Sequence, residues 1–234
     1  MRAVIRPLPA LALAFVVGAS AAAPPRPAPT PAPKPVPAPV IDQSRRIPVT
    51  PLRESLTLAY IRAHYDPAAT STQVVPRMIV VHWTATPTLA RTLELFGPDR
   101  LVGRADLRSA GDLNTGAQYV VDRDGHTYQL FGDTQMVRHV IGLNRAAIGI
   151  ENVGSGTLTP AQLTANERLV AFLVGKYPIN YLIGHLEYGR FRGSPLWEER
   201  DPAYFTPKVD PGAAFMAALR ARLKADGLSF LSAP

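Results

Sequence analysis

Short apolar runs, separated by polar and turn-forming residues, make up most of this chain. The runs at residues 78–82, 118–122, 127–131, 147–153 and 181–184 have the length and side chains of buried strands. Apolar residues recur at helical spacing over residues 51–64, 86–96, 160–176 and 211–224. This alternation predicts an α/β fold, in which a single domain has a mixed central β-sheet with helices on both faces.

Three local signals set boundaries within this pattern. Arg123-Asp124-Gly125 joins two of the strand-like runs, and Asp-Gly at such a junction indicates a β-hairpin. Thr50-Pro51 is typical of an N-cap followed by the first helical residue. The stretch Thr159-Pro160-Ala161-Gln162 predicts a capping box at the start of a long helix. Residues 97–116, which include Gly103, Gly111 and Gly116, are expected to form a loop.

The N-terminal segment has the pattern of an export signal at residues 1–21. Arg2 and Arg6 precede an apolar stretch, and Ala19-Ser20-Ala21 offers small residues for cleavage. The stretch is shorter than the roughly 20 residues of a membrane span, so we expect no stable span after cleavage; an uncleaved anchor is the alternative. The many prolines and alanines of residues 22–43 indicate a Pro/Ala-rich linker. We therefore expect an exported bacterial protein, periplasmic or secreted.

Composition narrows the chemistry that the domain can carry. The chain has no cysteine, which excludes a disulfide framework, a thiolate nucleophile and a cysteine-rich zinc site. The net charge of +7 suits an anionic polymer, such as cell wall or nucleic acid. Because the basic residues are scattered and not interleaved with aromatic residues, we expect no nucleic-acid partner.

Three widely separated residues have the chemistry to hold one metal ion. His82 and His185 each end an apolar run, and Asp210 lies in the polar stretch before the last predicted helix. Two imidazoles and one carboxylate leave the fourth tetrahedral position of Zn²⁺ open for water, which is the pattern of catalytic sites. The alternatives are hydrogen-bonded core histidines and, for Asp210, a helix N-cap.

Further polar residues are candidates for chemistry near such an ion. Glu151 lies within an apolar run, where a carboxylate is costly unless it is paired or functional. It could act as an acid/base, with a structural hydrogen bond as the alternative. Lys208 precedes Asp210 by two residues, so both face the same side of an extended segment. His139, Asn144 and Arg145 lie in the loop before the Glu151 strand and are candidate substrate contacts.

Five stretches together resemble the zinc-dependent N-acetylmuramoyl-L-alanine amidases, the amidase type 2 family that shares its fold with peptidoglycan recognition proteins. They are residues 79–84 (IVVHWT), 118–125 (QYVVDRDG), 148–151 (IGIE), 183–185 (IGH) and 208–212 (KVDPG), in family order. The resemblance implies that His82, His185 and Asp210 bind Zn²⁺, that Glu151 is the catalytic acid/base and that Lys208 is its electrophilic partner. Ala117 stands where some members place a tyrosine, so the chain resembles the members that use glutamate.

The resemblance implies a domain plan and an activity. Residues 44–77 would be an N-terminal helical extension, and residues 78–228 the zinc amidase catalytic domain. The implied activity is hydrolysis of the amide bond between N-acetylmuramic acid and L-alanine, in peptidoglycan or its muropeptide fragments. The alternatives are a non-catalytic peptidoglycan-binding module and a zinc peptidase that cuts within the stem peptide.

One segment departs from the family pattern. The interval between His185 and Asp210 is longer than expected, and residues 187–206 have the character of an insertion that borders the pocket. This segment contains four acidic residues, which keep the identity of the third ligand open: Glu187, Glu198, Glu199 and Asp201.

Overall fold

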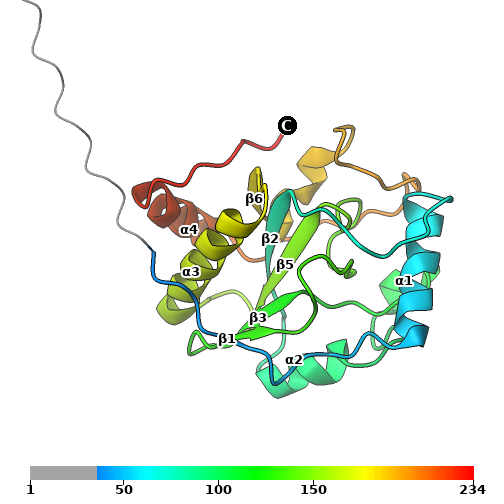
Figure 1. Ribbon diagram of the computed structural model, residues 1–234, viewed down its shortest axis with the longest axis horizontal. Coiled ribbons are helices and arrows are strands. Elements are labelled where there is room, and N and C mark those ends of the chain that lie inside the picture. Colours follow the sequence, from blue (N-terminus) through cyan, green and yellow to red (C-terminus); the bar gives the residue numbers. More distant parts are fainter. Residues whose placement is uncertain (1–35) are drawn as a thin grey trace, which may run out of the picture. The chain divides into compact units, whose positions relative to one another are not determined.

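The computed structural model describes residues 36–234, and the predicted signal peptide at residues 1–21 lies outside the described residues. Six strands form one sheet in the order β1-β4-β3-β5-β2-β6 (Figure 1). The strands are β1 (Ile41–Asp42), β2 (Met78–Trp83), β3 (Tyr119–Val121), β4 (Thr127–Gln129), β5 (Ala147–Asn152) and β6 (Tyr181–Gly184). β3, β5, β2 and β6 run parallel, whereas β4 is antiparallel to β3, so the predicted mixed sheet is confirmed.

The four predicted helices are present. They are α1 (Pro51–His64), α2 (Leu89–Phe96), α3 (Pro160–Lys176) and α4 (Ala213–Ala225). Thr50 caps α1, and Thr159 and Gln162 form the predicted capping box of α3. The last helix begins later than expected, with Gly212 at its N-cap and no side-chain capping bond. Asp210 therefore does not cap this helix, and its carboxylate is available for other partners.

Three short elements were not predicted. The expected loop at residues 97–116 contains a 3₁₀ helix, η1 (Ala105–Ala110), and a second one, η2 (His185–Phe191), follows β6 directly. Strand β1 lies in the segment that we assigned to the linker, and Ile41 pairs with Thr127 of β4. A strand of two residues has no periodicity in the sequence, so only its pairing partner identifies it.

Successive side chains of β2 point to opposite faces of the sheet, and each face carries its own part of the hydrophobic core. Ile79 and Val81 of β2 pack in the cluster that contains Leu169 of α3 and Leu219 of α4. Val80 packs in the cluster that contains Ile61 of α1. In Figure 1, α3 and α4 lie together on one side of the sheet and α1 lies on the other. The expectation of helices on both faces is confirmed, and β2 is apolar from Met78 to Val81, as expected for a strand with both faces covered.

Within residues 36–234, none of the helices combines the length and the apolar composition that crossing a bilayer requires.

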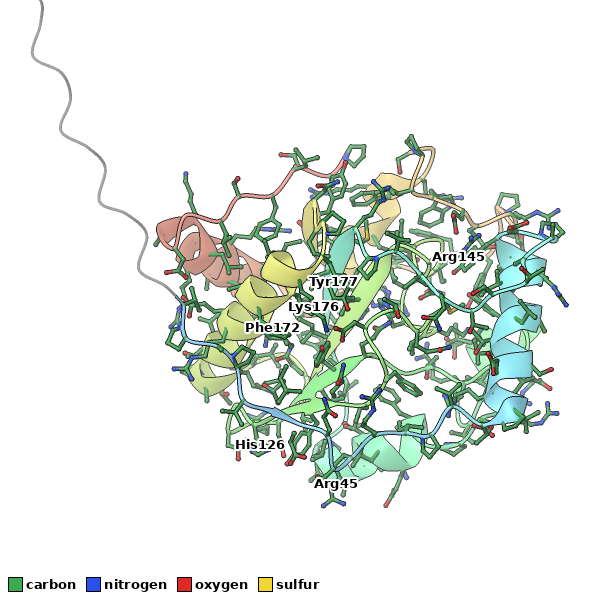
Figure 2. All side chains as sticks on the ribbon, in the orientation of Figure 1. Arg45, His126, Arg145, Phe172, Lys176 and Tyr177 are labelled. Atoms are coloured by element: carbon green, nitrogen blue, oxygen red, sulfur yellow. The ribbon has the colours of Figure 1, made fainter. Side chains whose placement is uncertain are left out.

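A buried carboxylate, Asp133, joins the hairpin to the end of α3. It accepts hydrogen bonds from Tyr119 (2.5 Å), Gln129 (2.7 Å), Lys176 (2.7 Å) and Tyr177 (2.9 Å). Figure 2 shows Lys176 and Tyr177 side by side at the end of α3. Burial alone would raise the pKa of Asp133, but the hydrogen bonds from Lys176, Tyr119 and Tyr177 hold this pKa below its usual range.

We expect Asp133→Asn to lower the free energy of unfolding at pH 7 by about 1.5–3 kcal/mol, because hydrogen bonds to a charged acceptor are lost. The folded-state pKa of Asp133 is depressed. Its stabilisation is therefore complete above the unfolded pKa of about 3.9 and is lost as the pH falls through the folded pKa. Urea unfolding at pH 7 and at pH 3 should show the difference between wild type and variant shrinking in acid.

The matched control is Asp112→Asn, which removes an exposed carboxylate paired with Arg100. Surface pairs of this kind contribute about 0–1 kcal/mol, so this variant should unfold nearly as the wild type does. Equal losses at the two positions would contradict the role of Asp133.

Candidate active site

Neighbouring strands bring His82 and Glu151 to one face at the carboxyl edge of the sheet. His82 lies opposite Glu151 in the parallel register of β2 and β5. His185 directly follows β6, the other neighbour of β2. The N–H of Leu186 donates to the carbonyl of Asp210 at 2.8 Å, which holds the Asp210 segment against this edge. The carboxyl ends of parallel strands are the usual place for ligands in open α/β sheets.

Three potential ligand atoms form a small triangle at this edge. His82 Nδ1 lies 3.0 Å from His185 Nδ1, and Asp210 Oδ2 lies 3.3 Å from the former and 3.1 Å from the latter. All three side chains are buried. In a tetrahedral Zn²⁺ site with bonds of 2.0–2.1 Å, ligand atoms lie about 3.3 Å apart. The triangle therefore has the dimensions of a zinc site.

The acidic residues of the 187–206 segment have other partners. Glu187 pairs with Arg220, and Glu199 lies 2.9 Å from His64 Nδ1. Glu198 is 3.6 Å from Arg145. Within residues 36–234, the group with ligand atoms within 4.8 Å of one another is His82, His185 and Asp210.

Electrostatics favour the protonation states that a metal needs. Burial, together with the electrostatic effect of the neighbouring His82 ring, lowers the pKa of His185 to about 4, so the His185 imidazole is neutral at pH 7. Burial would raise the pKa of Asp210, but its close contacts with His185 and His82 hold this pKa well below its usual range. Metal ligands must be a neutral imidazole and an ionised carboxylate, and these residues fit that requirement.

The pKa of Glu151 is shifted in the opposite direction to that of Asp210. It is only 9% exposed, and its Oε2 atom is buried with no hydrogen-bond partner within residues 36–234. Burial raises the pKa of Glu151 to about 7, although the electrostatic effect of the neighbouring His82 lowers it in part. A carboxyl group with this pKa exchanges a proton readily near neutral pH, as a general acid/base must.

A cavity of about 410 Å³ opens onto these groups. It is lined by seven of the eight candidate residues: His82, His139, Asn144, Glu151, His185, Lys208 and Asp210. Arg145, which Figure 2 labels, does not line it and instead lies 3.6 Å from Glu198. Burial, together with the charge of Arg104, lowers the pKa of Lys208. Lys208 thus lines the same cavity as the three atoms of the triangle.

Asn144 is fully buried in the cavity wall. Its Oδ1 accepts hydrogen bonds from the backbone N–H groups of His139 (2.8 Å) and Val140 (2.7 Å). Its Nδ2 donates to Tyr65 Oη at 2.7 Å. Because both ends of the amide are engaged within the protein, Asn144 holds the loop that carries His139.

Among the other residues that line the cavity, Tyr60, Arg104 and Arg138 were not expected from the sequence. The guanidinium of Arg138 is buried, lies 4.8 Å from the centre of the Tyr60 ring and donates to Tyr204 Oη at 2.9 Å. Tyr60, Arg138 and Tyr204 come from α1, from the loop before β5 and from the 187–206 segment, respectively. No local sequence signal connects positions so far apart. The expectation that the 187–206 segment borders the pocket holds for Tyr204.

A family model described as N-acetylmuramoyl-L-alanine amidase (Amidase_2) matches residues 71–213, which is more than half of the chain. The chain therefore belongs to this family of peptidoglycan amidases. A search of curated proteins found no match.

Several solved structures are similar to this chain. The amidase LysC from Clostridium intestinale is 22% identical, with 66% of this chain and 89% of that chain covered and a TM-score of 0.45. The Ph2119 endolysin, from a bacteriophage of Thermus scotoductus, is 20% identical (66% and 92% covered, TM-score 0.45). Human PGRP-IβC, in complex with a glycosamyl muramyl pentapeptide, is 19% identical (63% and 86% covered, TM-score 0.42).

The packing of His139 on β5 gives a test of the site geometry. A Cβ atom at Gly149 would lie 2.9 Å from Cγ and Nδ1 of His139. We expect Gly149→Ala to lower the free energy of unfolding by about 1–3 kcal/mol, because the ring must shift in a packed wall. The control is Gly175→Ala in α3, where a Cβ atom would have no neighbour within 4 Å; this change should add about 0.4–1 kcal/mol. Chemical denaturation that finds Gly149→Ala as stable as the wild type would contradict the packing.

Proposed function

We propose that this protein is a zinc-dependent N-acetylmuramoyl-L-alanine amidase that acts outside the cytoplasm. The bond cleaved is the amide between the lactyl group of N-acetylmuramic acid and the L-alanine of the stem peptide, in peptidoglycan or its muropeptide fragments. The triangle of His82 Nδ1, His185 Nδ1 and Asp210 Oδ2 is the observation that carries this proposal. It supports one ion held by two neutral imidazoles and one carboxylate, as in catalytic zinc sites.

Zn²⁺ held by these three atoms would supply Lewis acidity, which polarises a carbonyl group and makes water easier to deprotonate. Glu151 takes a proton from the attacking water as the water oxygen bonds to the amide carbon. The same carboxyl group then gives that proton to the alanine nitrogen as the carbon–nitrogen bond breaks. The buried, unpaired Oε2 and the pKa of about 7 support this double use.

Lys208 has a separate task in the same cavity. Its ammonium group carries a positive charge into a partly buried wall near Asp210 and Glu151. A charge fixed in such a place stabilises the negative charge that develops on the carbonyl oxygen during attack. In this proposal Lys208 stabilises the negatively charged carbonyl oxygen, and Glu151 carries out the proton transfers.

The arrangement favours an enzyme over a module that only binds peptidoglycan. A binding surface gains nothing from a buried carboxyl group without a hydrogen-bond partner, because such a group costs stability. In Glu151 the same burial that costs stability also raises the pKa to about 7, which suits proton transfer at neutral pH. The combination is typical of a catalytic acid/base.

The direct test is digestion of purified peptidoglycan and of soluble muropeptides, with and without a chelator, followed by mass analysis. The proposal predicts released stem peptides with free L-alanine amino termini, and loss of release when the metal is removed. Readdition of Zn²⁺ should restore release. Intact wall retained on the protein would mean a binding module instead, and cuts within the stem would mean a peptidase.

We expect Glu151→Gln to lower turnover by about 10²- to 10⁴-fold, because the proton acceptor is lost while the shape of the side chain is kept. Zinc content should stay at the wild-type level, since Glu151 is not among the three ligand atoms. Glu94→Gln makes the same substitution at an exposed position of α2 and should leave turnover unchanged. Near-normal turnover of fully metallated Glu151→Gln would refute the proposed role.

A further inference from the structure

The two histidines of the triangle differ at their second ring nitrogen. His82 Nε2 lies 3.1 Å from Nδ1 of His139, and the two rings meet nearly at a right angle (87°). His185 Nε2 is buried and has no hydrogen-bond partner within residues 36–234. Within the described residues, only His82 therefore has a protein group that can accept a proton from the ring nitrogen outside the triangle.

The contact between the two imidazoles requires one proton. If His82 Nδ1 offers its lone pair to a metal, the proton of the neutral ring must sit on Nε2. That N–H then donates to His139 Nδ1, so His139 must accept there and carry its own proton on Nε2. Partners of this kind orient metal-ligating histidines in many proteins, although the usual acceptor is a carboxylate, a carbonyl or water.

His139 is itself held from two sides. The absence of a side chain at Gly149 lets its ring lie against β5, where a Cβ atom would be 2.9 Å away. Asn144 accepts the backbone N–H of His139, and the amide of Asn144 donates to Tyr65 Oη. Tyr65 directly follows α1 and lies outside residues 71–213, the part of the chain that matches the family. A hydrogen-bonded chain thus runs from the N-terminal extension to the edge of the metal triangle.

We propose that His139 is a positioning residue: it accepts the Nε2 proton of His82 and so keeps the His82 Nδ1 lone pair directed at the metal position. Tyr65 and Asn144 hold His139 in the place where it can do this. This inference rests on the proposed metal site. Second partners of metal-binding histidines typically change metal affinity by 10- to 100-fold, and we expect an effect of about this size.

The test measures Zn²⁺ affinity by competition with a chromophoric chelator, on the whole protein and in the absence of substrate. His139→Leu replaces the ring with an apolar side chain of similar width and so removes the acceptor atom Nδ1. His139→Asn places an amide oxygen near the position of Nδ1 and so keeps an acceptor. We expect His139→Leu to bind Zn²⁺ about 10- to 100-fold more weakly than the wild type, and His139→Asn to recover most of that loss. His126→Leu, at an exposed histidine of the hairpin, should bind as the wild type does.

A role in packing alone predicts the opposite order, because asparagine leaves the larger gap. Wild-type affinity in His139→Leu, or a greater loss in His139→Asn, would overturn the proposal. If the wild type binds no Zn²⁺, the proposed function fails as well. Tight binding by the wild type and by His139→Leu alike would remove only the role of His139.

A second measurement decides the matter if His139→Leu does not fold. ¹⁵N-histidine NMR of the zinc-loaded wild type should show a proton on His82 Nε2 that is protected from exchange with water. The absence of such a proton would overturn the proposal.

Discussion

The close approach of three lone-pair-bearing atoms, His82 Nδ1, His185 Nδ1 and Asp210 Oδ2, is the constraint around which this domain is organised. Three such atoms within 3.0–3.3 Å of one another in a buried setting need a shared cation or shared protons. The strands of the sheet supply most of this arrangement. Two atoms come from the ends of adjacent parallel strands, and the third is held by a backbone hydrogen bond from Leu186 to Asp210. Rigid elements hold a site more exactly than loops do.

Much of this arrangement could be predicted because it depends on periodicity and on strand ends. The apolar run of β2 predicts a strand buried on both faces, and a histidine at its end must then lie at the sheet edge. His185 follows from the same reasoning on β6. Strand β1 and the walls of the cavity could not be predicted, since they depend on contacts between segments distant in the chain. Asn144 illustrates the limit: its place next to the candidate site was clear, but its burial and its bond to Tyr65 are properties of the folded chain.

The parts of the chain that lie apart from the central sheet help to build the cavity. Helix α1 and the 187–206 segment are joined by His64, whose ring nitrogen meets Glu199 and whose carbonyl accepts the N–H of Arg200. Arg138 lies against Tyr60 and bonds to Tyr204, so the two segments contribute to one wall. The shape of this side of the cavity thus depends on residues outside the five family-like stretches. Variation in these segments would change the cavity wall without changing the triangle of His82, His185 and Asp210.

The unpaired polar atoms of the molecule are concentrated at this cavity. Nine buried side-chain atoms within residues 36–234 have no hydrogen-bond partner, and five of them belong to cavity-lining residues: Tyr60, Arg138, His139, Glu151 and His185. Buried polar groups are otherwise almost always paired, because each unpaired group costs stability. The buried carboxylate of Asp133, away from the cavity, is by contrast paired with four hydrogen-bond donors. A domain that pairs Asp133 so completely, yet leaves Oε2 of Glu151 unpaired beside His82, retains that cost at the position where the proposed mechanism moves a proton.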